Sequence, residues 1–174
     1  KSIDSFKVLM SSNPQKAISF LNRANTLNQT INNDSISCRV LCNYGYYYYQ
    51  VNQRSKSKEI FVKALGLAKK GNYSYMLSYV YNNLGQIASD NGDYKEAINF
   101  YMASLKIAKK NQNAIFMSNA LNNLGNLFLV QKDTIKALEY YNQNVENALK
   151  NDLTQQLANG YMTLGGIYRL KESN

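Results

Sequence analysis

Apolar residues recur along the chain at intervals of three and four positions, which places them on one face of an α-helix. In the clearest stretch, residues 78–90, that face carries Val80, Tyr81, Leu84, Ile87 and Ala88. A second amphipathic stretch follows at 94–110, after the helix-breaking pair Asn91–Gly92. The two stretches predict a helical hairpin.

This pattern repeats with a period of 40 residues. Glycines share one register, and small residues share another that is trailed by a large apolar residue. The members are Gly45, Gly85, Gly125 and Gly165, then Ala17, Ser57, Ala97 and Ala137, then Leu21, Phe61, Tyr101 and Tyr141. Self-similarity at such a period is typical of stacked repeats. Because small residues let two helices cross closely, we expect Gly85 to contact Ala97.

The period divides the chain into a single array of about nine helices, all α. The predicted units are 1–33 for a degenerate first repeat, 34–72, 73–112 and 113–151 for three full repeats, and 152–174 for the first helix of a truncated fifth. Residues that suit helix starts support these limits: Asn13 before Pro14, Ser55, Asp93 and Asp133.

Net charge is +9, but many lysines fall where helices are predicted to end, and there a cation complements the helix dipole. Nucleic acid is therefore a minor alternative, with its densest basic group at Arg39, Arg54, Lys56, Lys58 and Lys63. No apolar run approaches the length of a membrane span, so we expect a soluble fragment without membrane contact.

Catalytic chemistry finds no support in the sequence. The chain has no histidine to act as a base, and its 11 carboxylates fall mostly at caps and outer faces. Cys38 and Cys42 are spaced i, i+4, which disfavours a disulfide and makes a poor metal site. We expect free thiols, no cofactor, no metal and no enzyme activity, and both cytoplasm and periplasm stay open as compartments.

The repeated motifs resemble the tetratricopeptide repeat family. Leu84–Gly85 followed by Gly92-Asp93-Tyr94-Lys95-Glu96-Ala97-Ile98 and Tyr101 is similar to its signature, and Leu124–Gly125 with Ala137 to Tyr141 is a second match. The 40-residue period exceeds the usual 34, as in the long-helix version found in bacterial peptide-pheromone receptors and kinesin light chains. The resemblance implies a right-handed superhelical solenoid of antiparallel helix pairs, whose first helices line a concave groove that binds peptides or proteins.

In each repeat, the apolar face of the first helix is expected to pack in the core. A second face of that helix remains to line the groove. The predicted groove residues are Arg39, Asn43, Tyr46 and Tyr49, with Cys42 beside them; Tyr79, Asn82, Asn83 and Gln86; Asn119, Asn122, Asn123 and Asn126; and Asn159 and Arg169. Asn43, Asn83 and Asn123 form a ladder at the repeat spacing. An amide both donates and accepts, which suits a peptide backbone, although 25 asparagines in the chain also make a purely compositional origin credible.

We therefore expect a non-enzymatic scaffold that captures a protein or peptide segment, with Arg39 and Arg169 attracting acidic groups. The alternative is a ligand-sensing module of a larger bacterial signalling protein, a transcriptional regulator or a sensor kinase. Self-association through the last helix is a third prospect, because Tyr161, Leu164, Ile167 and Tyr168 are expected to expose apolar surface there.

Overall fold

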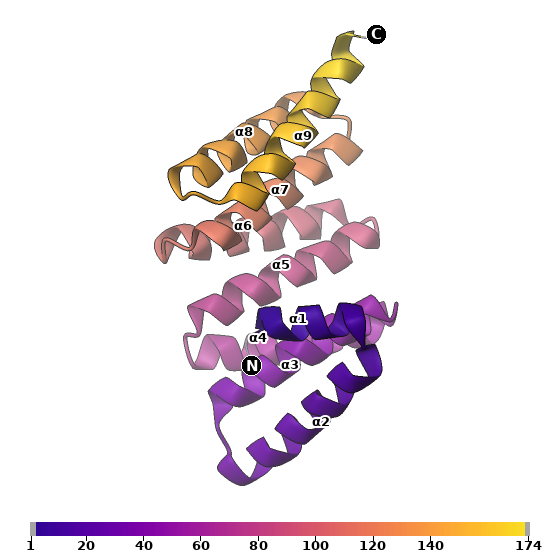
Figure 1. Cartoon of the computed structure of the whole chain (residues 1–174), viewed down its shortest axis with the longest axis vertical. Helices are drawn as coiled ribbons and strands as arrows, with labels where there is room; N and C mark the ends of the chain where they lie inside the picture. The colour runs from indigo at the N-terminus through magenta and orange to yellow at the C-terminus, as the bar shows by residue number, and fades with distance from the viewer. Residues whose placement is uncertain (1–2, 173–174) are drawn as a thin grey trace. The chain divides into compact units, whose positions relative to one another are not determined.

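The computed structural model describes residues 3–172, which form nine α-helices (Figure 1). Residues 1–2 and 173–174 of the first and last predicted repeats lie outside the described part. The helices are α1 (Ile3–Ser12), α2 (Pro14–Ile31), α3 (Asp34–Gln50), α4 (Arg54–Lys70), α5 (Ser74–Asp90), α6 (Tyr94–Lys110), α7 (Ala114–Val130), α8 (Thr134–Lys150) and α9 (Thr154–Glu172). The predicted all-α class is confirmed.

From α3 onward the backbone follows a period half as long as that of the sequence. Each helix from α3 to α8 has 17 residues and begins 20 residues after the one before it. Three residues join each pair of helices. The 40-residue sequence period therefore arises because successive helices alternate in role, while their lengths and turns are alike.

The turns share one backbone conformation. The residue before the last one of each turn has a positive φ, between 51° and 79°: Asn32, Asn52, Asn72, Gly92, Gln112, Lys132 and Asp152. After α7, for example, Lys132 N–H donates to Leu129 O and Asp133 N–H donates to Phe128 O, both at 2.9 Å. This pair of bonds is a Schellman motif, which satisfies carbonyls at the helix end.

The last residue of a turn also starts the next helix. Asp133 Oδ1 accepts from Lys136 N–H at 3.1 Å, and Asp93 Oδ1 accepts from Glu96 N–H at 3.3 Å. The predicted cap at Ser55 is wrong: Gln53 occupies the N-cap position of α4 and makes no side-chain capping bond. Because the turn has a fixed length, the cap falls at the same place before each of these helices.

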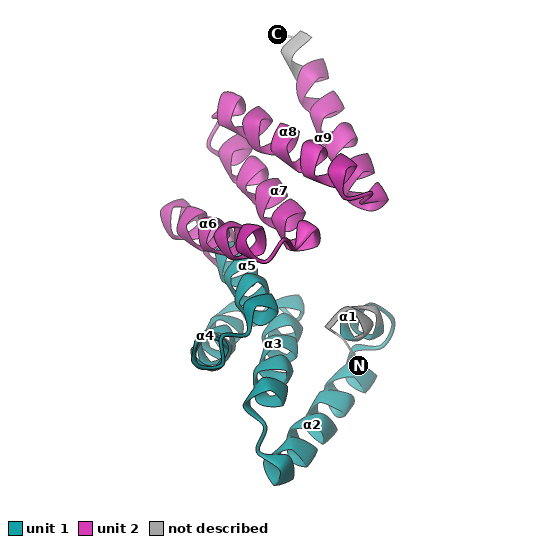
Figure 2. Ribbon diagram, turned by 90° about the vertical axis from the view of Figure 1, so that its left-hand side faces the viewer, with its two compact units in different colours: residues 1–87 teal, residues 88–174 magenta. Residues whose placement is uncertain are grey.

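The chain divides into two compact units, residues 1–87 and 88–174, coloured separately in Figure 2. The boundary lies inside α5, three residues before its end. In the second unit, α7 supplies more residues of the buried core than any other helix; α6 and α8 pack against α7, and α9 packs against α8. The core includes Leu121, Leu124, Leu127, Phe128, Tyr141, Val145, Leu164 and Ile167.

Two of the repeated glycines, Gly45 and Gly125, make room for aromatic rings. A Cβ added to Gly125 would lie 2.7 Å from Cε1 of Tyr141 in α8, and one added to Gly45 would lie 2.8 Å from the ring of Phe61 in α4. The small residue of the second helix contacts the same place, because Ser57 Oγ donates to Gly45 O at 2.7 Å. Gly45 thus receives both the Phe61 ring and the Ser57 hydroxyl, and Gly125 receives the Tyr141 ring.

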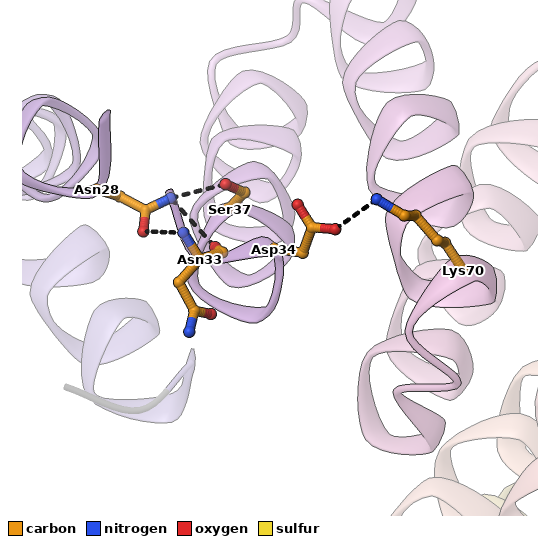
Figure 3. A network of polar contacts seen from close by, with 5 residues as sticks. All are labelled: Asn28, Asn33, Asp34, Ser37 and Lys70. Carbon is orange, nitrogen blue, oxygen red and sulfur yellow. Dashed lines mark hydrogen bonds and ion pairs between the residues drawn. The ribbon is translucent and has the colours of Figure 1, made fainter. Parts of the chain in front are cut away.

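In the first unit, hydrogen bonds and an ion pair between side chains link the ends of α2, α3 and α4 (Figure 3). Asn28 Nδ2 in α2 donates to Ser37 Oγ in α3 at 2.6 Å and to Asn33 O at 3.3 Å. Lys70, in the last turn of α4, forms an ion pair with Asp34 at 2.8 Å. The lysine thus complements the end of its own helix and the acidic first turn of α3.

Candidate peptide-binding faces

A stripe of asparagines runs along α7 in the second unit. Its members are Asn119, Asn122, Asn123 and Asn126, which we call the α7 polar stripe. Their spacing of i, i+3, i+4 and i+7 places them on one side of the helix. Leu124 and Phe128 are buried in the core cluster, whereas the stripe is half-buried at its first three positions and exposed at Asn126. The stripe therefore offers amides beside a packed, rigid helix face.

Asn126 accepts a hydrogen bond from a buried residue of the core. The Tyr141 hydroxyl donates to Asn126 Oδ1 at 2.6 Å. Burial raises the pKa of Tyr141 to about 12, so the phenol stays protonated and remains a donor at neutral pH. This bond orients the Asn126 amide, and its NH₂ group is the end left to face away from Tyr141.

The first unit carries a shorter set on α5. Asn82, Asn83 and Gln86, the α5 polar stripe, are all half-buried. Asn83 Nδ2 donates to Tyr79 O one turn earlier at 2.7 Å. Tyr79 itself does not belong to an open face, because its side chain is 3% exposed and its ring centroid lies 6.3 Å from that of Phe61. Placing Tyr79 in the groove was wrong: it packs inside the unit.

On α3 the predicted residues separate into different environments. Arg39 is exposed, while Tyr46 and Tyr49 are half-buried. Asn43 is only 6% exposed and its Oδ1 is buried without a hydrogen-bond partner. Helix α1 packs against α3, and Tyr46, one turn from Asn43, contacts the cluster that contains Phe6 and Met10. The α3 member of the predicted ladder is thus enclosed rather than presented to a ligand.

The last helix exposes both polar and apolar residues. Asn159 and Arg169 are exposed. Leu164 and Ile167, expected on an exposed apolar surface, are instead buried in the core of the second unit. Tyr161 and Tyr168 do lie exposed, and Met162, which sequence reasoning missed, is 77% exposed. Tyr161 and Tyr168 share one side of the helix, but Met162 lies off that side, so their spacing gave no signal for it.

The two cysteines are free and fully buried on α3. Cys38 Sγ donates to Ala64 O in α4 at 3.4 Å. A hydrogen bond between the two thiols lowers the pKa of Cys38, and the same bond together with burial raises the pKa of Cys42. The expected position of Cys42 on the groove is therefore wrong, since its thiol belongs to the hairpin interior.

Residues of the densest basic group contact other groups of the chain. Arg54 Cζ lies 5.5 Å from the ring centroid of Tyr49, and Lys56 Nζ lies 4.2 Å from that of Tyr48. Lys63 pairs with Glu59 at 2.6 Å, and this hydrogen bond lowers the pKa of Glu59. These contacts with tyrosines and a carboxylate compete with phosphate binding.

Sequence comparison agrees with the resemblance found in the motifs. A family model described as tetratricopeptide repeat matches residues 37–110, which include α4, α5 and α6. The predicted resemblance to this family is confirmed. Tetratricopeptide repeats generally mediate protein–protein interaction and are typically non-catalytic. No curated protein sequence matches the chain.

Three solved structures with the same fold are similar to this chain. A Signal Transduction ATPase with Numerous Domains (STAND) protein with a tetratricopeptide repeat sensor, from Pyrococcus horikoshii, matches 91% of this chain at 19% identity with a TM-score of 0.73. This chain covers 25% of that protein. The apo form of RapI matches 94% of this chain at 18% identity, with a TM-score of 0.72 and 68% of its own length covered.

BtubC (BKLC) from P. vanneervenii matches 98% of the chain at 15% identity, with a TM-score of 0.67 and 83% of its own length covered. At these identities the neighbours show the fold alone.

Within the described residues, none of the helices combines the length and the apolar character needed to cross a membrane.

Proposed function

We propose that the chain is a non-enzymatic scaffold that binds an extended peptide or protein segment through the α7 polar stripe. The observation that carries this proposal is the arrangement of four asparagines on one side of a helix whose other side is locked in the core. Rigid presentation matters, because a helix that is already packed loses little entropy when a ligand binds.

The chemistry of the stripe suits a peptide backbone. Each asparagine offers a carbonyl acceptor and two N–H donors, which complement the N–H and C=O groups of an extended chain. Asn126 is oriented by Tyr141, so one amide of the stripe is fixed before a ligand arrives. Binding of this kind reads the backbone and tolerates varied side chains, and exposed Arg39 and Arg169 favour acidic segments in each unit.

The test is a selection of displayed peptides on the whole chain, followed by titration of a selected peptide. Asn122→Ala with Asn123→Ala removes two adjacent amides of the stripe. We expect the Kd to rise by at least about tenfold, since a hydrogen bond contributes on the order of 1 kcal/mol.

Asn99→Ala with Asn142→Ala provides the matched control, because both asparagines are exposed on the second helices α6 and α8. This control is expected to keep the parent Kd. Equal affinity of the parent and the Asn122/Asn123 variant, or equal losses in both double variants, would contradict the role of the stripe.

A sensory role is the second candidate. The tetratricopeptide repeats of the Pyrococcus horikoshii neighbour are described as a sensor, and this chain covers a quarter of that protein. Peptide binding that also changes the activity of an attached kinase, ATPase or DNA-binding domain would favour this role. Peptide binding without any effect on the full-length protein's activity would favour the simple scaffold.

A further inference from the structure

The chain contains two Asn–Gly pairs, and the structure places them in different surroundings. Asn91–Gly92 lies in the turn between α5 and α6, and Asn159–Gly160 lies inside α9. Such a pair is reactive because the backbone nitrogen of glycine, which no side chain shields, can attack the amide carbon of the asparagine. Both asparagines are exposed, so access of solvent to the amide does not distinguish the two pairs.

The backbone at Gly92 is open. Gly92 is exposed, it has a φ of 79°, and a Cβ added to it would meet nothing within 4 Å. Its N–H donates to Ser89 O at 3.0 Å, at the very end of α5. Because helix ends open at little cost in free energy, the nitrogen of Gly92 can turn toward the side chain of Asn91.

The backbone at Gly160 is enclosed. Gly160 is buried, and a Cβ added to it would lie 2.6 Å from Cγ2 of Val145 in α8. Both carbonyl groups of Asn159 accept hydrogen bonds, Oδ1 from Gln155 Nε2 at 3.3 Å and the backbone O from Thr163 Oγ1 at 2.9 Å. The pair also lies more than one turn inside α9. Attack there requires consecutive helix hydrogen bonds to break while Gly160 leaves its place against Val145.

We propose that Asn91 is a site of spontaneous deamidation, made reactive by the open turn after α5, whereas α9 protects Asn159. The same glycine that best suits the left-handed conformation of this turn leaves its nitrogen unshielded. This modification is separate from peptide binding by the α7 polar stripe, and either can fail without the other.

The reaction needs only water as a co-reactant. The N–H of Gly92 gives its proton to a solvent base, and the nitrogen bonds to Cγ of Asn91. Nδ2 takes up a proton and leaves as ammonia, so a cyclic imide remains. Water then opens the ring at either carbonyl group. Cleavage between the nitrogen and Cγ gives aspartate, and cleavage between the nitrogen and the main-chain carbonyl carbon gives isoaspartate.

The isoaspartate product changes the turn. Its main chain runs through the former side chain and is one carbon longer, whereas the helices from α3 to α8 are joined by turns of a single length. The bonds from Gly92 N–H to Ser89 O at 3.0 Å and from Asp93 N–H to Ala88 O at 2.9 Å depend on that length. Either product also adds a negative charge at the C-terminal end of α5, which the helix dipole disfavours. Deamidation should therefore loosen this turn.

Ageing of the whole chain tests the proposal. The folded protein is kept in mildly alkaline buffer prepared with water enriched in heavy oxygen, then digested in ordinary water and analysed by mass spectrometry. A product of ageing carries the heavy oxygen, whereas a product of the digestion does not. We expect Asn91 to react at least about tenfold faster than Asn159, and we expect both aspartate and isoaspartate at position 91.

Two controls separate the fold from the local sequence. In concentrated urea, which removes the fold, the two asparagines should react at comparable rates because both precede glycine. Gly92→Lys is the matched variant, since Lys132 has a φ of 62° at the equivalent place after α7. This variant keeps the turn and shields the nitrogen, so the deamidation rate of Asn91 should fall to that of Asn159 or below.

Four results would overturn the site: folded Asn91 that reacts no faster than Asn159, a difference in rate that persists in urea, aspartate without isoaspartate, or an unchanged rate in Gly92→Lys. The effect on the turn is tested by urea unfolding of the isoaspartate form, separated by ion exchange. Asn91→Asp carries the same charge on a main chain of ordinary length. We expect the isoaspartate form to unfold at a lower urea concentration than the parent and Asn91→Asp, and equal midpoints would overturn the loosening.

Discussion

The ring of Tyr141 occupies the space that a side chain on Gly125 would need, because an added Cβ would lie 2.7 Å from its Cε1. The ring is fully buried, so it has little freedom to move aside. A helical glycine costs about 1 kcal/mol relative to alanine, and here the buried ring compensates for that cost. A Cβ added to Gly165 of α9 would meet nothing within 4 Å.

Alanine at Gly125 and at Gly165 should therefore have opposite effects. For Gly125→Ala we expect a loss of roughly 1–2 kcal/mol in the free energy of unfolding, since overpacking outweighs the gain in helix propensity. For Gly165→Ala we expect a gain of about 0.5–1 kcal/mol. Urea denaturation measures both, and effects of the same sign would contradict the close approach of the ring.

Two buried asparagines of α8 provide a second contrast. Asn147 Nδ2 donates to Ser118 Oγ at 2.8 Å and to Ala114 O at 2.9 Å, whereas Asn144 Oδ1 is buried without a partner. We expect Asn147→Ala to lose about 1–3 kcal/mol and Asn144→Ala to lose nothing or to gain up to about 1 kcal/mol. Thermal unfolding of the two variants checks this order, and a larger loss for Asn144→Ala would show that its carbonyl is satisfied.

The left-handed turn residues predict a stabilising change at Lys132. Its φ of 62° is a conformation that glycine adopts without strain, as Gly92 does at the equivalent place after α5. Lys132→Gly should raise the free energy of unfolding by roughly 0.5–1 kcal/mol. Lys106→Gly, at an exposed position inside α6, should lower it by about 1 kcal/mol. Denaturation curves in which both glycines destabilise would exclude strain at Lys132.

Much of this architecture follows from local patterns in the sequence. The three-four spacing of apolar residues defines the helices, and Asp93 and Asp133 mark their starts because the capping carboxylate is local. The strict turn conformation is less visible, since Gln112 and Lys132 adopt positive φ without the glycine that signals it. There the fixed turn length, imposed by packing of successive helices, overrides the preference of the residue.

The faces of the helices were harder to predict than the helices themselves. Tyr79 was assigned to a groove from periodicity alone, yet it packs on Phe61 of the preceding helix. Asn43 is enclosed on a face of α3 that α1 approaches. Leu164 and Ile167 were expected outside but reach the core. In each case the deciding neighbour comes from another helix, and its position cannot be read from the periodicity of one segment.

Tyr141 should also make stability depend on alkaline pH. Burial raises its pKa from 10.0 to about 12, so the folded state holds the phenol proton more tightly than the unfolded state does. The resulting stabilisation is fully present below pH 10 and is lost as the pH rises through about 12. Tyr141→Phe has no phenol proton to lose at this position.

The free energy of unfolding of the parent should therefore fall more steeply between pH 10 and pH 12 than that of Tyr141→Phe. At neutral pH the parent should be the more stable protein by about 1 kcal/mol, because the variant lacks the hydrogen bond to Asn126. Tyr168→Phe removes an exposed phenol and should follow the parent curve. Parallel curves for the parent and Tyr141→Phe across this window would show that the buried phenol is not what the alkaline transition titrates.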